Sequence, residues 1–270
     1  ITFPYVSRIL LPEGTGRVSF ATSVVSYFLM LSQLGIPTYG IRACAKVRDD
    51  RRKLSRVVHE LMAINLVMSL LSYLALGIFV FAIPRLRAES SLIFIISLTI
   101  LLNAVGMEWL YKALEQYTYI TIRSVIFKAI AVVAMLLLIR QQSDYVVYGA
   151  LTILAASASN VCNFVHAHTY IDLFPEEKYN YRQHMKPILV FFAMSCATVI
   201  YTNLDTVMLG LMKNNVDVGY YNAAVKIKGI LVGIVTSLGT VMLPRLSYYV
   251  ERGELEEFQR LTKKAMNFVI

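Results

Sequence analysis

The feature that most constrains this chain is a succession of seven apolar runs, each long enough to cross a lipid bilayer as a helix. They cover residues 17–41, 59–83, 91–111, 119–139, 145–169, 187–212 and 218–243. About 20 apolar residues in a helix span the roughly 30 Å hydrocarbon core of a membrane. With 57% hydrophobic and 16% charged residues, the 270-residue chain is too apolar for a soluble domain of its size. We therefore predict an all-α polytopic membrane protein.

The two ends of the chain have the pattern of further helices. ITFPYV at the start predicts the end of an earlier helix, because a charged turn, SRILLPEGTGR, follows it; KKAMNFVI at the end predicts the start of a later one. We therefore expect about eight transmembrane helices in a fragment of a longer protein. Two charged connections, GIRACAKVRDDRRKLSRVV and LPRLSYYVERGELEEFQRLTKK, predict short amphipathic helices on the membrane surface.

The charges between the runs are distributed unequally on the two sides of the membrane. The chain has 26 Lys and Arg against 17 Asp and Glu, a net charge of +9. Alternate connections place seventeen of the basic residues on one side and six on the other. The positive-inside rule assigns the first side to the cytoplasm, so the positive charge needs no nucleic-acid partner. The cysteines, Cys44, Cys162 and Cys196, show neither disulfide nor metal-site spacing.

A weak internal repeat predicts how the chain divides. LSQLGIPTYGIR (31–42) aligns with VTSLGTVMLPRL (235–246), which places Gly35 over Gly239. The two copies stand six helices apart, so they share one orientation across the membrane, as in two parallel six-helix halves. We predict that residues 1–185 form the first half, with its first helix truncated. Residues 186–270 then begin the second half with its seventh and eighth helices and the start of the ninth.

Polar residues inside the apolar runs indicate a pathway, because charges at membrane depth are costly and usually face a bundle interior or an aqueous cavity. The 187–212 run carries Ser195, Thr198, Thr202 and Asp205 on one face. Asn222 and Lys226 follow in the next run. Asp205 and Lys226 both lie about 15 Å from the intervening turn, at 1.5 Å per residue. An interhelical ion pair is therefore expected, either structural or opening during transport.

Other polar residues are weaker candidates. Glu108 and Lys128 have similar depths on either side of a turn and could pair, whereas Arg8 could be an interfacial arginine or face the cavity mouth. Ser26 and Gln33 share an uncharged polar face of the first long run. His59, His166, His168 and His184 lie at cytoplasmic ends, where solvated or capping roles are expected. The sequence has no hydrolase, phosphate-loop, zinc-protease or dinucleotide motif, so we predict no enzymatic activity.

Several strings together resemble one family: ITFPYVSRIL, LGIPTYGIR followed by AKVRDD, EWLYKALEQYTYITIRS, IYTNLDTVMLG, VGYYNAAVKI and TSLGTVMLPRLSYY. The chain resembles the Wzx-type O-antigen and polysaccharide repeat-unit flippases, a branch of the MATE-like exporter (MOP) superfamily. The resemblance covers essentially the whole chain. It implies a two-lobed bundle of twelve to fourteen helices in the bacterial cytoplasmic membrane. Such a bundle moves undecaprenyl-pyrophosphate-linked oligosaccharide between leaflets by alternating access, for O-antigen, capsule or exopolysaccharide synthesis.

The resemblance also implies roles for single residues. Lys226 matches a cationic residue for the pyrophosphate, with Arg8, Lys128 and Asn222 as further substrate candidates. Asp205, and less directly Glu108, would be a counter-ion or a site for a coupling ion. No cofactor is implied. Coupling to H⁺ or Na⁺ stays open, and a polysaccharide polymerase is an expected partner beside the lipid substrate.

Two other functions remain open. A cation-coupled drug or metabolite antiporter of the same fold should have an acidic cavity, whereas this chain has three in-helix lysines against two mid-helix acids. A polytopic glycosyltransferase or acyltransferase should carry catalytic Asp, Glu or His clustered on a sizeable loop. The longest loops here are merely basic, so we prefer the flippase.

Overall fold

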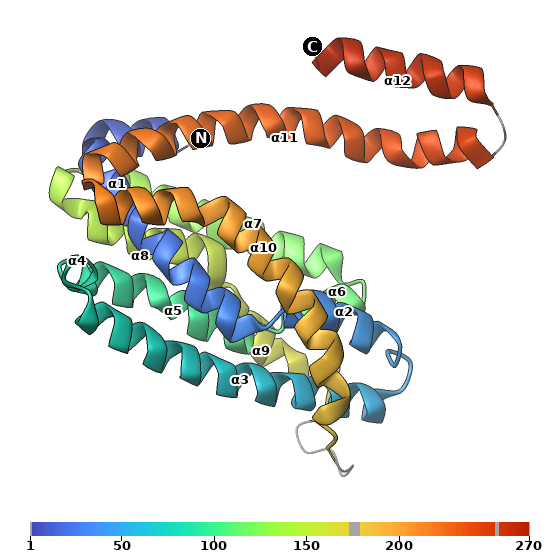
Figure 1. Ribbon diagram of the computed structural model, residues 1–270. Coiled ribbons are helices and arrows are strands. Elements are labelled where there is room, and N and C mark those ends of the chain that lie inside the picture. Colours follow the sequence, from blue (N-terminus) through green and yellow to red (C-terminus); the bar gives the residue numbers. More distant parts are fainter. Residues whose placement is uncertain (1, 173–178, 252–253, 270) are drawn as a thin grey trace. The chain divides into compact units, whose positions relative to one another are not determined.

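The computed structural model describes residues 2–172, 179–251 and 254–269, and these segments are helices joined by short turns (Figure 1). Residues 1–219 and 220–270 form two compact units. Among the described residues, five helical segments are long and apolar enough to cross a membrane, and Ser90–Gly106 is a shorter apolar helix. The five are Phe3–Ala45, Arg51–Ala82, Tyr117–Leu138, Gln142–Thr169 and Arg182–Met212.

The first apolar segment is interrupted twice. Helix α1 (Phe3–Gln33) has a non-helical residue at Leu11, directly before Pro12, because proline restricts the residue that precedes it. The predicted charged turn is therefore a kink between two helical pieces. At its other end α1 stops at Gln33, short of residue 41, since Leu34 and Gly35 adopt left-handed φ angles of 45° and 75°. Helix α2 (Ile36–Ala45) follows as a separate short helix.

The next helices pack around α1. Asp50 caps α3 (Arg51–Ala82) by accepting hydrogen bonds from the backbone N–H groups of Arg52 and Lys53. The short α4 (Pro84–Arg87) leads into α5 (Ser90–Gly106). Met107 then takes a left-handed φ of 40° and separates α5 from α6 (Glu108–Ala113), so the predicted 91–111 run is two helices.

The remaining segments match the predicted runs more closely. Helix α7 spans Tyr117–Leu138. A composite segment follows: η1 (Gln142–Asp144), α8 (Tyr145–Ile153), the π-helical η2 (Leu154–Ala158), α9 (Asn160–His166) and η3 (Ala167–Thr169). The long helices α10 (Arg182–Met212) and α11 (Asn215–Glu251) meet at a two-residue turn. Helix α12 (Leu255–Val269) follows α11, as the charged segment after the last apolar run predicted. Its location on the membrane surface stays a prediction.

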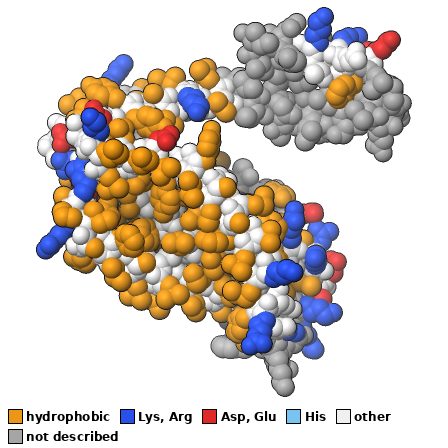
Figure 2. Space-filling view, viewed as in Figure 1, with side chains coloured by type: hydrophobic (Ala, Val, Ile, Leu, Met, Phe, Trp, Pro, Cys, Tyr) orange, Lys and Arg blue, Asp and Glu red, His pale blue; other side chains and the backbone are white. Residues whose placement is uncertain are grey.

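The distribution of side chains in the first unit is the reverse of that in a soluble protein. In α3, Asn65, Ser69 and Ser72 are buried, whereas Leu70 and Leu74 are 63% and 60% exposed. Figure 2 shows the same pattern over the bundle, with hydrophobic side chains between ends that carry the Lys and Arg. Exposed apolar faces of this extent require a lipid environment. The prediction of an all-α polytopic membrane protein is confirmed.

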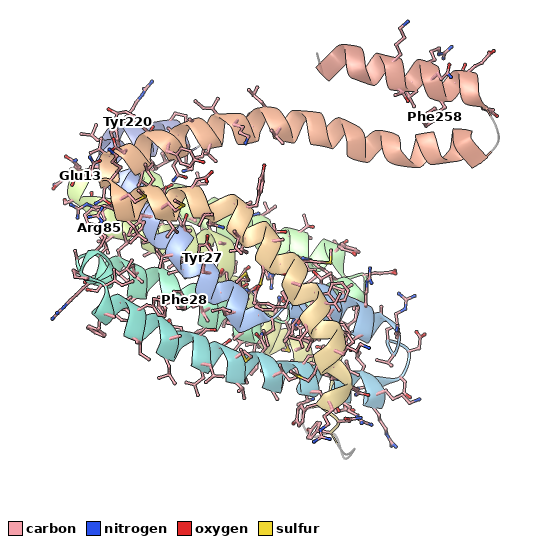
Figure 3. The ribbon with its side chains drawn as sticks, in the orientation of Figure 1. Glu13, Tyr27, Phe28, Arg85, Tyr220 and Phe258 are labelled. Carbon is pink, nitrogen blue, oxygen red and sulfur yellow. The ribbon has the colours of Figure 1, made fainter. Side chains whose placement is uncertain are left out.

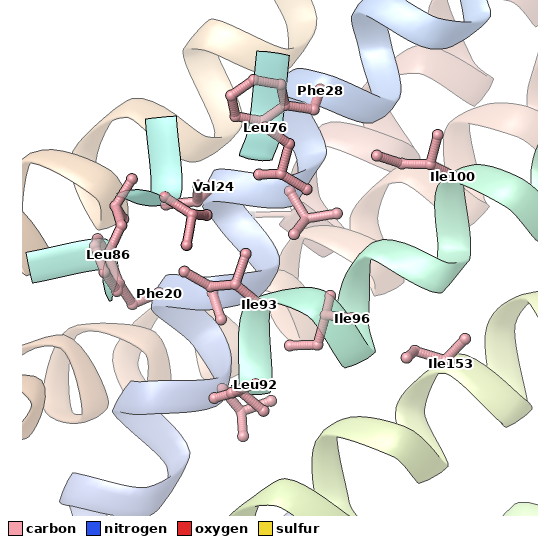
Figure 4. Close-up of a cluster of buried hydrophobic side chains, with 14 of the residues drawn as sticks. Phe20, Val24, Phe28, Leu76, Leu86, Leu92, Ile93, Ile96, Ile100 and Ile153 are labelled. Carbon is pink, nitrogen blue, oxygen red and sulfur yellow. The ribbon is translucent and has the colours of Figure 1, made fainter. Parts of the chain in front are cut away.

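Helix α1 is the centre of the first unit and packs against α3, α5 and α10. Its Phe20, Val24 and Phe28 side chains enter an apolar core together with Leu76 of α3 and isoleucines of α5 (Figure 4). Helix α10, expected to open the second half, thus belongs to the same compact unit as the first half. The predicted boundary near residue 185 separates sequence halves and stays a prediction.

Candidate functional site

A pocket of about 450 Å³ lies between α1, the start of α2 and α10. Its apolar lining includes Met30, Phe191 and Met194. Its polar lining comprises Ser26, Gln33, Thr38, Ser195, Thr198 and Asn203. The pocket therefore offers several uncharged hydrogen-bonding groups at a depth where the outer surface of the bundle is apolar.

Four of the five residues predicted as polar lining surround this pocket: Ser26, Gln33, Ser195 and Thr198. The hydroxyl groups of Ser195 and Thr198 donate to the carbonyl oxygens of Phe191 and Met194, one turn earlier in α10. Their oxygen atoms can still accept hydrogen bonds from a ligand.

The fifth predicted residue, Thr202, is outside the lining, and its neighbour Asn203 takes that place. The side-chain Nδ2 of Asn203 donates to the Thr202 hydroxyl at 2.9 Å. Sequence reasoning missed Asn203 and Thr38, although an amide inside an apolar run carries the same signal as the hydroxyls that were chosen.

Asp205 lies farther along α10, within electrostatic range of Tyr27 of α1. It belongs to the first unit, whereas Lys226 and Asn222 are on the part of α11 that belongs to the second. The predicted Asp205–Lys226 pair involves residues of different units and stays a prediction.

Glu108 forms ion pairs different from the one expected. Its carboxylate lies 2.8 Å from Lys112 Nζ and 3.9 Å from Arg123 Nη2. Arg123 is buried and also donates to the carbonyl oxygen of Ser159, 3.0 Å away, because its position on α7 faces the bundle. Lys128, just over one turn farther along α7, is exposed beside lipid-facing residues, and Arg8 is exposed on the first piece of α1.

A polar network closes the end of the first unit that the charge distribution assigns to the outer side. Arg17 pairs with Glu13 at 2.8 Å and with buried Glu89 at 3.4 Å. Asn215 donates to Glu89, and Arg85 donates to Asn215 at 2.7 Å. Glu13 and Arg85 mark this end in Figure 3. The network joins α1, α4, the start of α5 and the start of α11.

A second buried network lies near the opposite, basic end, between α2, α3 and α10. Glu60 of α3 is fully buried and accepts hydrogen bonds from His184 Nε2 at 2.6 Å, Gln183 at 2.9 Å and Arg56 at 3.0 Å. The other ring nitrogen of His184 contacts the Tyr39 hydroxyl at 2.8 Å. The expectation that His184 is solvated or capping is wrong, because packing of α10 against α2 and α3 encloses it. Among the described residues, no cluster of three or more His, Cys, Asp or Glu could hold a metal ion.

The sequence of this chain is similar to those of known proteins. The family model described as "Polysaccharide biosynthesis protein" matches residues 1–250. The chain is 21% identical to the "Putative O-antigen transporter" of Escherichia coli (strain K12), over 92% of this chain and 60% of that protein. It is 26% identical to the protein of the same name from Shigella dysenteriae, over 92% and 62%. The chain thus spans about three fifths of the length of these curated relatives. No solved structure matches it.

Proposed function

Since the chain belongs to the polysaccharide biosynthesis protein family, we propose that it is part of a flippase for lipid-linked oligosaccharides. The substrate is an undecaprenyl-pyrophosphate-linked repeat unit, and the location is the bacterial cytoplasmic membrane. The names of the two relatives support transport of an O-antigen intermediate. Transport changes the side of the membrane and makes or breaks no covalent bond, so the protein needs no catalytic residue.

The observation that carries this proposal is the uncharged polar pocket between α1, α2 and α10. A sugar presents many hydroxyl groups, each of which needs a partner when it leaves water. Ser, Thr, Asn and Gln side chains supply both donors and acceptors. The apolar lining of the pocket, such as Phe191, suits the C–H faces of a sugar ring. The polyprenyl tail stays in the lipid, against the exposed apolar helix faces.

The two polar networks support an alternating-access cycle. The network around Arg17 and Glu89 joins helix ends on the outer side, whereas the pocket lies toward the basic, cytoplasmic ends of α1 and α10. In the proposed cycle, substrate enters from the cytoplasmic side while the outer network is intact. Entry then requires that the network around Glu60 or an equivalent contact opens, and release requires that this end closes while the outer network separates.

The charged groups of the cycle are assigned from the family resemblance. Lys226 is proposed to attract the pyrophosphate, because a multiply charged anion gains most from a cation on a water-lined face. Asp205 is proposed as its counter-ion between substrates, or as a site for a coupling proton or sodium ion. A polymerase that consumes the flipped repeat unit is the expected partner.

A cation antiporter of the same fold is the second candidate, and the pocket argues against it. Within the described part of the chain, its polar lining contains neither Asp nor Glu, whereas an organic cation would need a carboxylate once desolvated. Asp205, which lies outside the lining, would then have to bind the cation.

The test uses the full-length protein in proteoliposomes and measures movement of a defined undecaprenyl-pyrophosphate-linked oligosaccharide from one leaflet to the other. We expect translocation above that of protein-free vesicles, and a strong loss in Thr198→Leu, which fills the pocket. Thr121→Leu, the same change on the exposed face of α7, is the matched control and should retain full activity. Movement no faster than in protein-free vesicles, with several repeat units tried, contradicts the flippase.

A further inference from the structure

We propose that a second, smaller cavity in the first unit binds one sugar ring of the transported substrate, an inference that rests on the proposed function. This side cavity has a volume of about 150 Å³ and lies between α1, α2, α3, α5, α6 and α9. It shares Gln33 and Pro37 with the larger pocket. Its other polar lining groups are Asn65, Asn103, Asn160, Glu108 and Lys112.

Asn65 supplies the observation that points to a ligand. Its side chain is 3% exposed, and its Oδ1 atom has no hydrogen-bond partner among the residues that the structure describes. Its Nδ2 atom donates to the carbonyl oxygen of Ala104 at 3.2 Å, which holds the amide in one orientation. A buried oxygen that lacks a donor costs free energy, so an acceptor kept at this depth is explained by a group that donates to it. A sugar hydroxyl is such a group.

The neighbouring amides form a rigid frame around this acceptor. Asn160 donates to Asn103 Oδ1 at 3.3 Å, and Asn103 donates to the hydroxyl of Ser157 at 3.1 Å. Gly106 permits this approach, because a Cβ atom there would lie 2.5 Å from Asn160 Cγ. The amides are therefore oriented by the protein before any ligand arrives, which lowers the entropic cost of binding.

The charges at the cavity favour a neutral polyol over a metal ion or an organic cation. The carboxylate of Glu108 already faces two cations, Lys112 at 2.8 Å and Arg123 at 3.9 Å. A further cation would be repelled by both of them. The carboxylate of Glu108 and the ammonium group of Lys112 can both form hydrogen bonds with hydroxyl groups. The buried ring of Trp109 adds an apolar wall to the cavity.

The side cavity is larger than a single-water site and shares part of its lining with the larger pocket. Its volume of about 150 Å³ exceeds that of a single water, which occupies about 30 Å³ in the liquid. Because Gln33 and Pro37 line both spaces, a ring held in the side cavity can remain linked to the next ring in the larger pocket. The side cavity would thus select the sugar at one position of the repeat unit.

The experiment measures binding of free monosaccharides to the purified full-length protein in detergent. The probes are glucose, galactose, rhamnose and N-acetylglucosamine. The readout is the fluorescence of Trp109, taken as the difference between each protein and its Trp109→Phe counterpart. We expect a saturable change with at least one sugar, and an affinity about tenfold weaker in Asn65→Leu, from the loss of about one well-made hydrogen bond.

A second variant and a matched control keep the outcome clear. Asn103→Leu alters a half-buried residue and should weaken the same sugar if Asn65→Leu fails to fold. Ser69→Ala removes another buried polar atom of α3 that has no partner among the described residues. It lies one turn from Asn65 and outside the cavity lining, so this variant should bind sugar normally. Size-exclusion profiles establish that each variant is folded.

Three outcomes overturn the proposal. The first is the absence of a saturable response to any sugar, which indicates a water-filled space. The second is an unchanged affinity in the folded Asn65→Leu and Asn103→Leu variants, and the third is a response to Na⁺ in place of sugar. Binding in detergent needs no bilayer, so the two proposals can fail separately. Sugar binding without lipid translocation would refute the flippase and keep the sugar site. Translocation without sugar binding would refute the sugar site and keep the flippase.

Discussion

Replacing Glu60 with alanine should destabilise the protein severely, although Glu60 lies outside both pockets. The carboxylate is fully buried and accepts hydrogen bonds from Arg56, Gln183 and His184, and from the backbone N–H of Asn180. Truncation leaves these donors without this acceptor, and among them the ring N–H of His184 is buried. Hydrogen bonds to a charged group contribute about 1.5–3 kcal/mol each, so the loss of those from His184 and Gln183 should cost about 3–6 kcal/mol. At 1.4 kcal/mol per tenfold, the unfolding equilibrium shifts by about two to four orders of magnitude.

The assay compares Glu60→Ala with Glu115→Ala in the full-length protein in detergent. Glu115 also forms an ion pair of 2.8 Å, with Arg48, but its side chain is 70% exposed. An exposed pair of this kind contributes little to stability. Thermal unfolding, followed by loss of the monodisperse size-exclusion peak after heating, should show a large decrease for Glu60→Ala and almost none for Glu115→Ala.

The result that would refute this reasoning is a similar small decrease for both variants. It would mean that the network around Glu60 is open to water in the folded protein and does not join α2, α3 and α10. Glu60→Gln provides an intermediate case: it keeps the shape, removes the charge and replaces one acceptor oxygen with a donor. Its stability should therefore lie between that of the wild type and that of Glu60→Ala.

Three other changes test separate parts of the structure. Gly35→Ala should lower the free energy of unfolding by about 2 kcal/mol or more, because the new Cβ would lie 2.6 Å from the α10 backbone at a φ of 75°. Thermal unfolding measures this change, and unchanged stability would contradict the close approach. A membrane-impermeant thiol reagent should modify Thr198→Cys in the pocket much faster than Leu70→Cys on the lipid face, and equal rates would argue against a water-filled pocket. Lys226→Ala should depress lipid translocation more than Asp205→Asn, whereas full rescue by exchanging the two residues would exclude a substrate role for Lys226.

The membrane spans could be predicted from the sequence because hydropathy depends on local composition. The runs 119–139 and 145–169 correspond closely to α7 and to the composite segment of α8, η2 and α9. The resemblance to polysaccharide-export proteins is confirmed by the family match over residues 1–250. The helix breaks at Leu34–Gly35 and at Met107 were missed, since both lie where the apolar character continues and only the left-handed φ angles end the helix.

The candidate site could be predicted in part. Ser195 and Thr198 were found because their spacing places them on one face of a single helix, and the structure places them around one pocket with Ser26 and Gln33 of α1. Asn65, Asn103 and Asn160 belong to three different helices, so no spacing within one run brings them together.

Apolar runs, basic connections and polar stripes were sufficient to establish a multi-pass helical membrane protein and the helix faces that avoid lipid. Each of these properties belongs to one segment of chain at a time. The partners of Glu60, the Glu108–Arg123 pair and the side cavity depend on which helices touch and in what register, which only the tertiary structure decided. Residues far apart in sequence are brought within hydrogen-bonding distance by packing, and the proposed sugar-binding cavity depends on groups that packing joins.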